Sequence, residues 1–298
     1  MMRRTVASTP DIQILVATNE HRDSIRGLCL FVGGPRDHVL LFFQQPFLSE
    51  DFVPFVAVRD SVAVGVACAL VLEPYVWLMG LRVHPDWRNQ KIAQRLVERI
   101  TQFATMRRQP VKAVVLAANA PAVRVFTNAG FAAQSGFTLM EATIGAVRPS
   151  HFWDRTVARE AIAPERAEIA SFLSAHYPLA FDHANLFGEN FVWRPISSND
   201  ELERLIASRR LLISHDGLGA VSGVAVVNNE PDRTVEIGRI WGEPAPFLWH
   251  IIETTAPPRL RWYLSGEAEE DQARQFRFQI SSTGPSERRY LIFTKGSA

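Results

Sequence analysis

Two basic residues stand where the chain could bind a phosphate group. Arg88 and Lys91 lie in a short polar segment between an apolar run, Tyr75 to Val83, and a helical pattern that opens at Ile92. The first N–H groups of a helix have no intrahelical acceptor, and the aligned peptide dipoles place partial positive charge there. We therefore expect a phosphate or pyrophosphate at this helix start, with the two basic side chains adding formal charge.

The segments on either side of this turn must hold it in place. The run Tyr75 to Val83 is apolar almost throughout, as a strand buried on both faces requires. After the turn, apolar residues recur at helical spacing and polar residues fill the other face, so this helix packs on a sheet with one side. Its apolar positions are Ile92, Leu96, Ile100 and Phe103.

The same stretch resembles the GNAT N-acyltransferases, whose pyrophosphate loop reads Q/R-x-x-G-x-G/A. The loop of this chain comprises Arg88, Asn89, Gln90, Lys91, Ile92 and Ala93. Its first and last positions match the family, but Lys91 stands where the middle glycine is expected. Lysine keeps the backbone N–H and loses glycine's freedom at positive φ, so its side chain either pairs with the pyrophosphate or crowds it.

A second motif of the family, N-x-x-A-x-x-x-Y-x-x-x-G-F, is matched downstream. The matching residues are Asn119, Ala122, Phe126, Gly130 and Phe131. In the family the asparagine contacts the pantetheine arm of CoA or positions the helix, and the tyrosine often gives a proton to the leaving thiolate. Phe126 has no hydroxyl, so that proton must come from another residue or water, or the thiolate must leave without it.

The resemblance implies an α/β (α+β) fold, with a mixed twisted sheet flanked by helices, and an amine that attacks the thioester of acetyl-CoA. It places CoA against the loop, against Asn119 and Phe126, and against the main chain of Leu81 and Val83. In this fold Glu20 to Leu30 forms a helix that lines the acceptor cleft.

The acid and the base of such a reaction are harder to assign. Glu73 is the candidate base and Tyr75 the candidate acid, at the start of the central strand. Glu73 also fits a solvated surface carboxylate, because it precedes Pro74 in an expected turn. His84 is expected to bond the loop backbone, and Glu141 is a further candidate for the base.

Three functions are open. The first is an N-acyltransferase that moves an acetyl or acyl group from CoA to an amine of a small molecule or peptide. The second is a non-catalytic acyl-CoA-binding or interaction protein on the same scaffold, which Phe126, Lys91 and the degenerate second half of the chain favour. The third is a protein that binds the phosphate of a nucleotide with the same loop.

The second half repeats the first in weakened form. A hairpin of Leu211 to Ser214 and Leu218 to Val227 is followed by an apolar run, Arg233 to Trp241. In place of the basic loop stands Gly242 to Pro246, where two prolines remove N–H donors and an acid repels anions. We expect two GNAT-like domains in tandem, residues 1–148 with one CoA site and residues 149–298 without a phosphate loop. The second domain shapes the acceptor cleft or replaces a dimer partner in a monomer; the oligomeric state is open.

Composition agrees with an enzyme of two domains. The chain has 298 residues, 47% of them hydrophobic, and a formal net charge of +1. Near-neutral charge argues against nucleic acid or an anionic membrane as partner. No apolar run approaches about 18 residues and no signal peptide is recognised, which favours the cytoplasm. Cys29 and Cys68 are too few and too far apart for a disulfide framework or a cysteine metal site, so no metal is expected.

Overall fold

The computed structural model describes residues 12–35, 37, 39–43, 51–143, 157–176, 186–189, 192–196, 199–230, 233–264, 267–280 and 289–296. The chain divides into two compact units. Unit 1 comprises Met1–Val115, Asn119–Gln134 and Ile292–Ala298, and unit 2 comprises Leu116–Ala118 and Ser135–Leu291. Both units are discontinuous in sequence, whereas the domains predicted at 1–148 and 149–298 are continuous. That boundary lies outside the described residues and stays a prediction.

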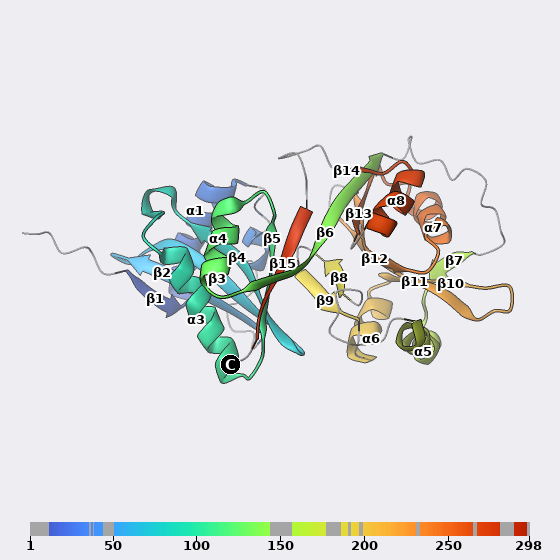
Figure 1. Ribbon diagram of the computed structural model, residues 1–298, viewed down its shortest axis with the longest axis horizontal. Helices are drawn as coiled ribbons and strands as arrows, with labels where there is room; N and C mark the ends of the chain where they lie inside the picture. The colour runs from blue at the N-terminus through green and yellow to red at the C-terminus, as the bar shows by residue number, and fades with distance from the viewer. Residues whose placement is uncertain are drawn as a thin grey trace, which may run out of the picture. The chain divides into compact units, whose positions relative to one another are not determined.

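Unit 1 contains a sheet flanked by helices (Figure 1). Its elements are β1 (Gln13–Val16), α1 (Arg22–Gly33), α2 (Val39–Phe42), β2 (Phe52–Arg59), β3 (Val62–Leu72), β4 (Tyr75–Val83), α3 (Ile92–Met106), β5 (Val111–Leu116) and α4 (Ala120–Asn128). Short 3-10 helices cover Asn19–His21 and Pro85–Trp87. Strands β6 (Ala132–Thr143) and β15 (Arg289–Lys295) contribute residues to both units.

The strands of unit 1 follow the order β1-β2-β3-β4-β5. Neighbours from β1 to β4 are antiparallel, and β4 and β5 are parallel. The predicted strand Tyr75 to Val83 is confirmed as β4, and the predicted helix that opens at Ile92 is confirmed as α3. A parallel neighbour requires a crossover, and α3 provides it.

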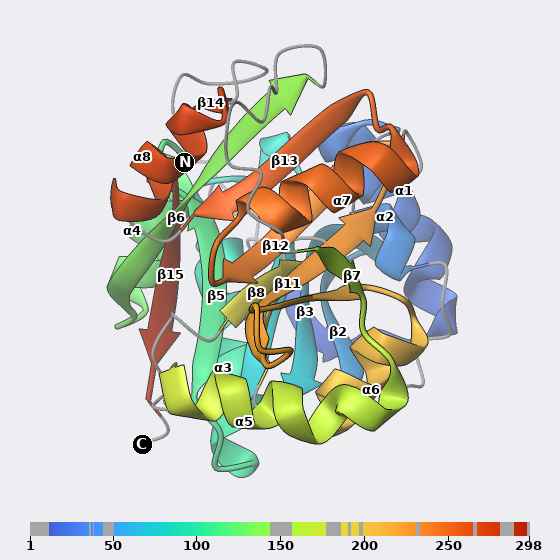
Figure 2. The same cartoon turned by 90° about the vertical axis from the view of Figure 1, so that its right-hand side faces the viewer.

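Helices cover both faces of this sheet. On β3, a Cβ added at Gly65 would lie 2.8 Å from Cγ2 of Ile92, so Gly65 faces α3. Cys68 lies an odd number of residues further along and therefore faces the other side. There a Cβ added at Gly80 would meet Cγ1 of Val39 in α2 at 3.2 Å and the Cys68 thiol at 3.7 Å. Figure 2 shows α1 and α2, in blue, on one side of β2 and β3, and α4, in green, on the other.

Unit 2 repeats this order of elements. They are β7 (Ala158–Glu160), α5 (Arg166–His176), β8 (Leu186–Glu189), β9 (Val192–Pro195), α6 (Asn199–Ala207), β10 (Leu211–His215), β11 (Val221–Asn229), β12 (Val235–Trp241), α7 (Ala245–Thr255), β13 (Arg259–Leu264), α8 (Glu267–Gln275) and β14 (Gln279–Ile280). The strand order is β6-β13-β12-β11-β10-β7, and β12 and β13 are the parallel pair. The series β10, β11, β12, α7, β13 thus corresponds to β2, β3, β4, α3, β5 of unit 1.

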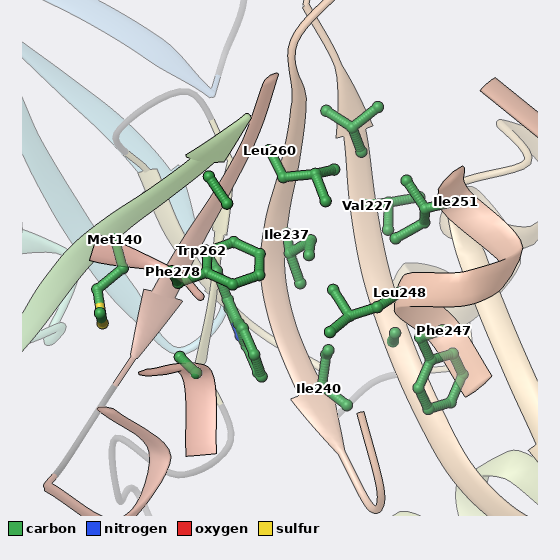
Figure 3. Packing of buried hydrophobic residues seen from close by; sticks show 14 of the residues in the cluster. Met140, Val227, Ile237, Ile240, Phe247, Leu248, Ile251, Leu260, Trp262 and Phe278 are labelled. Atoms are coloured by element: carbon green, nitrogen blue, oxygen red, sulfur yellow. The ribbon is translucent and has the colours of Figure 1, made fainter. Parts of the chain in front are cut away.

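The apolar face of α7 covers the sheet of unit 2. Figure 3 shows Leu248 and Ile251 of α7 pointing toward Ile237 and Val227 of the strands. Phe247, on the same helix, is fully buried. Each such side chain contributes about 1.5–3 kcal/mol to the free energy of unfolding.

One predicted boundary in unit 2 is wrong. A strand was expected to begin at Leu218, but β11 begins at Val221, and Leu218 is 95% exposed. The cause is Asp216, whose Oδ1 accepts the N–H groups of Leu218 at 2.9 Å and of Ala220 at 3.0 Å. This Asx-type turn consumes the donors that a strand would need.

Candidate functional site

The two parallel strands of unit 1 separate part of the way along β4. Pairing with β5 is confined to Val76↔Val111, Trp77↔Lys112 and Leu78↔Ala113. Strand β4 continues to Val83 without a further partner residue in β5. The second half of β4 therefore has one edge on which main-chain groups are open to a bound molecule.

A bulge at Gly80 marks the point of separation. The register between β3 and β4 shifts between Val66↔Arg82 and Cys68↔Met79, so that β4 holds one extra residue. Gly80 adopts φ +67°, a backbone conformation in which a side chain would be strained. A bulge changes which residues of a strand direct their N–H and C=O groups to a given edge.

The bulge turns Leu81 and Val83 toward the open edge. Before it, the Val76 N–H donates to the carbonyl of Pro110 on the β5 side at 2.9 Å. After it, the His84 N–H donates to the carbonyl of Val64 on the β3 side at 3.0 Å. Because residues alternate along a strand, Leu81 and Val83 then direct their main-chain groups away from β3. These are the two residues that the sequence predicts as main-chain contacts.

Arginine side chains reach both carbonyls. Nη1 of Arg82 donates to the oxygen of Leu81 at 3.1 Å, and Nε of Arg88 lies 3.5 Å from the oxygen of Val83. The open edge is therefore polar. Its net positive charge comes from Arg88, because the charge of Arg82 is paired with Asp37.

The loop after β4 presents a series of free donors. The first helical bond of α3 runs from the Arg95 N–H to the carbonyl of Lys91 at 2.9 Å. In the part of the chain that the structure describes, the N–H groups from Asn89 to Gln94 have no acceptor. Asn89 adopts φ +63° and Lys91 adopts φ +59°, both left-handed. Successive N–H groups in such a turn, at the start of a helix, can bind an anion.

Lys91 adopts a left-handed backbone at the position where the family motif has glycine. Its φ of +59° and ψ of 16° lie in the left-handed region, at a cost of about 1–2 kcal/mol for an L-residue. Its side chain is exposed and forms no ion pair with a described residue. Arg88, Asn89 and Gln90 are exposed as well. Ile92 is buried against β3, so it can offer only its N–H to a ligand.

The second motif builds and anchors α4. Oδ1 of Asn119 accepts the Ala122 N–H at 3.2 Å and so caps the helix. Phe126 is 3% exposed, and its ring lies 5.2 Å from that of Phe131 and 5.5 Å from that of Phe293. Both residues thus have structural roles, and their contact with CoA stays a prediction.

Glu73 and Tyr75 lie at the opposite end of β4 from the loop. Glu73 is exposed in the turn that precedes the strand. Tyr75 is 1% exposed, with Nζ of Lys112 4.8 Å from its ring centroid. At about 3.3 Å per residue, Tyr75 is about 26 Å from Val83 along the strand. The structure does not bring these two side chains to the open edge, and their catalytic roles stay predictions.

Two other candidates have partners. Nδ1 of His84 accepts the Asp86 N–H at 3.3 Å, which confirms the expected bond to the loop backbone. The His84 ring also stacks on Phe31 at 4.6 Å. Glu141, in unit 2, accepts a hydrogen bond from Nε of Arg261 at 2.8 Å, so this carboxylate is part of an ion pair.

An ion pair between Asp37 and Arg82 was not predicted. Nε and Nη2 of Arg82 donate to the two oxygens of Asp37 at 2.9 and 2.7 Å. Asp37 is 6% exposed, and the residues lie 45 positions apart. A local sequence pattern does not indicate a contact over that separation.

Unit 1 contains two cysteines, Cys29 and Cys68. Both are buried and free. Burial, aided by the charge of Asp37, raises the pKa of Cys29 to about 12, and burial likewise raises the pKa of Cys68. At neutral pH both are therefore thiols.

Unit 2 has no equivalent of the donor loop where α7 begins. Gly242 adopts φ +104°, and a Cβ there would lie 2.7 Å from the Ser222 carbonyl. Pro244 precedes the helix and Pro246 lies in its first turn, so neither provides an N–H. Glu243 adds an exposed acid. This segment does not favour an anion.

The described residues contain no group of three His, Cys, Asp or Glu side chains arranged to hold a metal ion. None of their helices is both long enough and apolar enough to cross a membrane.

In unit 1 an opened parallel strand pair leads into a donor loop. Residues 23–131 match the family described as "Acetyltransferase (GNAT) family". Over these residues the resemblance inferred from the sequence is confirmed. No curated protein matches the chain.

Solved structures are similar over nearly the whole chain. A GCN5-related N-acetyltransferase from Sphaerobacter thermophilus is 15% identical, with a TM-score of 0.68 and 96% of each chain covered. A tandem GNAT protein from the clavulanic acid biosynthesis pathway is 11% identical, with a TM-score of 0.64 and 97% of this chain and 99% of that chain covered. A putative acetyltransferase from Thermoplasma acidophilum is 13% identical, with a TM-score of 0.60 and coverage of 96% and 100%. These likenesses confirm the predicted mixed sheet flanked by helices.

Proposed function

We propose that the protein is an N-acyltransferase that moves an acetyl or acyl group from CoA to an amine of a small molecule or peptide. The observation that carries this proposal is the run of unbonded N–H groups from Asn89 to Gln94, directly after the open edge of β4. The open strand edge leads directly into the anion site. This arrangement suits a ligand with a pyrophosphate at one end and amide groups along its length.

The residues of unit 1 fit the parts of acetyl-CoA in order along the chain. The pyrophosphate is held by the loop N–H groups, with Arg88 and Lys91 supplying charge. The pantetheine amides bond to the main chain of Leu81 and Val83 as an added strand would. The thioester then lies toward the bulge at Gly80, where β4 and β5 meet.

The reaction makes a C–N bond and breaks the C–S bond of the thioester. The acceptor ammonium first loses one proton to become the attacking amine, and the nitrogen loses a second proton as the amide forms. The thiolate leaves with the electron pair of the C–S bond and takes up one proton, so one proton is released overall. Phe126 is buried and cannot give the thiolate a proton, so water or another residue provides one. Glu73 and Tyr75 remain the proposed base and acid, and a chain of waters is the route by which they would act over the distance from the open edge.

The acceptor approaches from the side of α1. This direction follows from the family resemblance, which places the helix after the first strand along the acceptor cleft. Unit 2, which lacks the donor loop, is proposed to contribute no CoA site. Because Cys29 and Cys68 are free thiols, a reducing, cytoplasmic location accompanies the proposal.

A non-catalytic acyl-CoA-binding protein is the second candidate. The burial of Phe126 favours it, because the position from which the family donates a proton is occupied by a core side chain. Such a protein would bind CoA through the same loop and leave the thioester intact.

Two measurements separate these functions. Calorimetry compares acetyl-CoA, CoA and ATP, and release of free thiol from acetyl-CoA is then followed over a panel of primary amines. Heat with both CoA species and amine-dependent thiol release support the transferase. Heat without thiol release supports the binding protein, and equal heat with ATP supports a general phosphate site. Arg99→Gln serves as the control variant for CoA binding and thiol release. Arg99 is an exposed residue of α3, so its substitution removes one positive charge at a distance from the loop.

A further inference from the structure

The connection between α1 and α2 is attached to β4 by a buried, two-point ion pair. Oδ1 of Asp37 accepts from Nη2 of Arg82 at 2.7 Å, and Oδ2 accepts from Nε at 2.9 Å. The Asp37 side chain is 1% exposed and that of Arg82 is 22% exposed. A planar guanidinium that meets both oxygens fixes orientation as well as distance.

Asp37 also shapes its own segment. Its Oδ1 accepts the Val39 N–H at 3.0 Å, at the first residue of α2. A Cβ added at Gly33 would lie 2.1 Å from Oδ2 of Asp37, so the end of α1 must be glycine for the carboxylate to reach its place. The carboxylate therefore joins the end of α1, the start of α2 and the strand.

A second contact lies on the bulge itself. Val39 is fully buried, and its Cγ1 would be 3.2 Å from a Cβ at Gly80. Arg82 follows Gly80 by two residues and donates through Nη1 to the carbonyl of Leu81 at 3.1 Å. The α1–α2 connection thus meets β4 at the point where that strand leaves β5, and the same arginine contacts the open edge.

We propose that Asp37 and Arg82 are positioning residues for acyl transfer. They clamp the α1–α2 connection, which lies on the acceptor side, against the bulge of β4, and so fix the acceptor relative to the opened strand. This inference rests on the proposed transferase function. It assigns to the pair a role in orientation, and neither residue is proposed to move a proton.

The test removes both charges at once. A double variant, Asp37→Asn with Arg82→Gln, leaves no unpaired buried charge, whereas either single change would. Hydrogen exchange of the amides of residues 39–43 is compared with that of residues 89–94. We expect faster exchange in the first segment, unchanged exchange in the second and unchanged affinity for CoA by calorimetry.

Kinetics provide the readout that a purely structural role would not move. With the amine that gives the fastest thiol release in the panel, we expect kcat of the double variant to fall by about tenfold or more, because small displacements of reacting groups are costly. The KM for acetyl-CoA stays constant. Arg82→Lys keeps the charge but not the two-point geometry, and it is expected to give an intermediate kcat. Arg99→Gln is the control and should give the wild-type kcat and KM.

The outcomes are distinct. Unchanged exchange at residues 39–43 and unchanged kcat in the double variant would overturn the proposal, as would a loss confined to CoA affinity. If no amine releases thiol with the wild-type protein, the transferase function fails and the positioning role fails with it. In that case the hydrogen exchange of residues 39–43 still shows whether the Asp37–Arg82 pair orders the α1–α2 connection.

Discussion

The ring of Phe126 packs at 5.5 Å against the ring of Phe293, a residue close to the C-terminus. Phe126 belongs to the second GNAT motif, and Phe293 belongs to the part of β15 that lies in unit 1. Nζ of Lys295, two residues further on, donates to the carbonyl of Ala129 at 2.7 Å, at the end of α4. The last strand of the chain therefore completes the unit that holds the donor loop.

Phe293→Ala should destabilise the protein. Removal of a buried phenylalanine costs about 3–5 kcal/mol in the free energy of unfolding, through lost burial and the cavity left beside Phe126. Urea denaturation checks this value. Lys295→Met is the matched comparison. It loses the bond to the end of α4 and the contact of its ammonium with the Phe131 ring, 5.8 Å away, and should cost about 1 kcal/mol. Equal stability of wild type and Phe293→Ala would show that the strand is not part of the fold of unit 1.

Phe126→Tyr should not create a working acid. The ring is 3% exposed between Phe131 and Phe293, so a hydroxyl added there is buried among aromatic rings. Without a partner it should lower the free energy of unfolding by about 1–3 kcal/mol. Thiol release should not rise. A faster release with tyrosine would show that the side chain reaches the thioester after all.

The elements of unit 1 could be predicted because their signals are local. Strand β4 and the start of α3 were predicted from apolar runs and helical spacing, and both are confirmed. The bulge at Gly80 was not predicted, because it depends on the register with β3, and a single glycine within an apolar run does not reveal that register. It also decides that Leu81 and Val83 face the open edge, which the family resemblance had suggested without a geometric reason.

Long-range contacts account for most of what the sequence could not predict. The Asp37–Arg82 pair joins segments that share no motif. The contact of Phe126 with Phe293 unites residues far apart in the chain. Tyr75 was proposed as an acid because it stands beside Glu73 at the start of the strand, and the structure buries it beside Lys112 there. The sequence predicts where a residue stands along a strand. Whether the side chain of that residue is buried depends on the helices and strands that pack against it.

Lys91→Gly should raise stability and weaken CoA binding. Glycine relieves the left-handed strain and should add about 1 kcal/mol to the free energy of unfolding. The exposed ammonium is available to the pyrophosphate, so its loss should weaken CoA by about fivefold, as expected for an exposed ion pair of about 1 kcal/mol. Calorimetry at several salt concentrations should also show a flatter salt dependence.

Asn89→Gly is the matched control for Lys91→Gly. Asn89 adopts a similar left-handed backbone at φ +63° but carries no charge. The substitution Asn89→Gly should leave the salt dependence of CoA binding unchanged. Tighter binding in Lys91→Gly would mean that the lysine side chain obstructs the pyrophosphate.

The ion pair between Arg159 and Glu165 should make the stability of the protein depend on pH. The hydrogen bond from Arg159 holds the pKa of Glu165 below its ordinary value of 4.5, burial opposes this, and the Ile162 N–H, which donates at 2.9 Å, supports it. A carboxyl whose folded pKa is lowered stabilises the fold above its unfolded pKa, and that contribution is lost as pH falls through the folded value. Arg159→Gln should therefore be less stable than wild type at pH 7, with the difference shrinking below the unfolded pKa of Glu165. Urea denaturation from pH 7 into the acid range measures this, with Arg166→Gln as the control because Glu203, its partner, is 69% exposed. A difference that stays constant through the acid range would assign the effect to packing of the arginine stem rather than to charge.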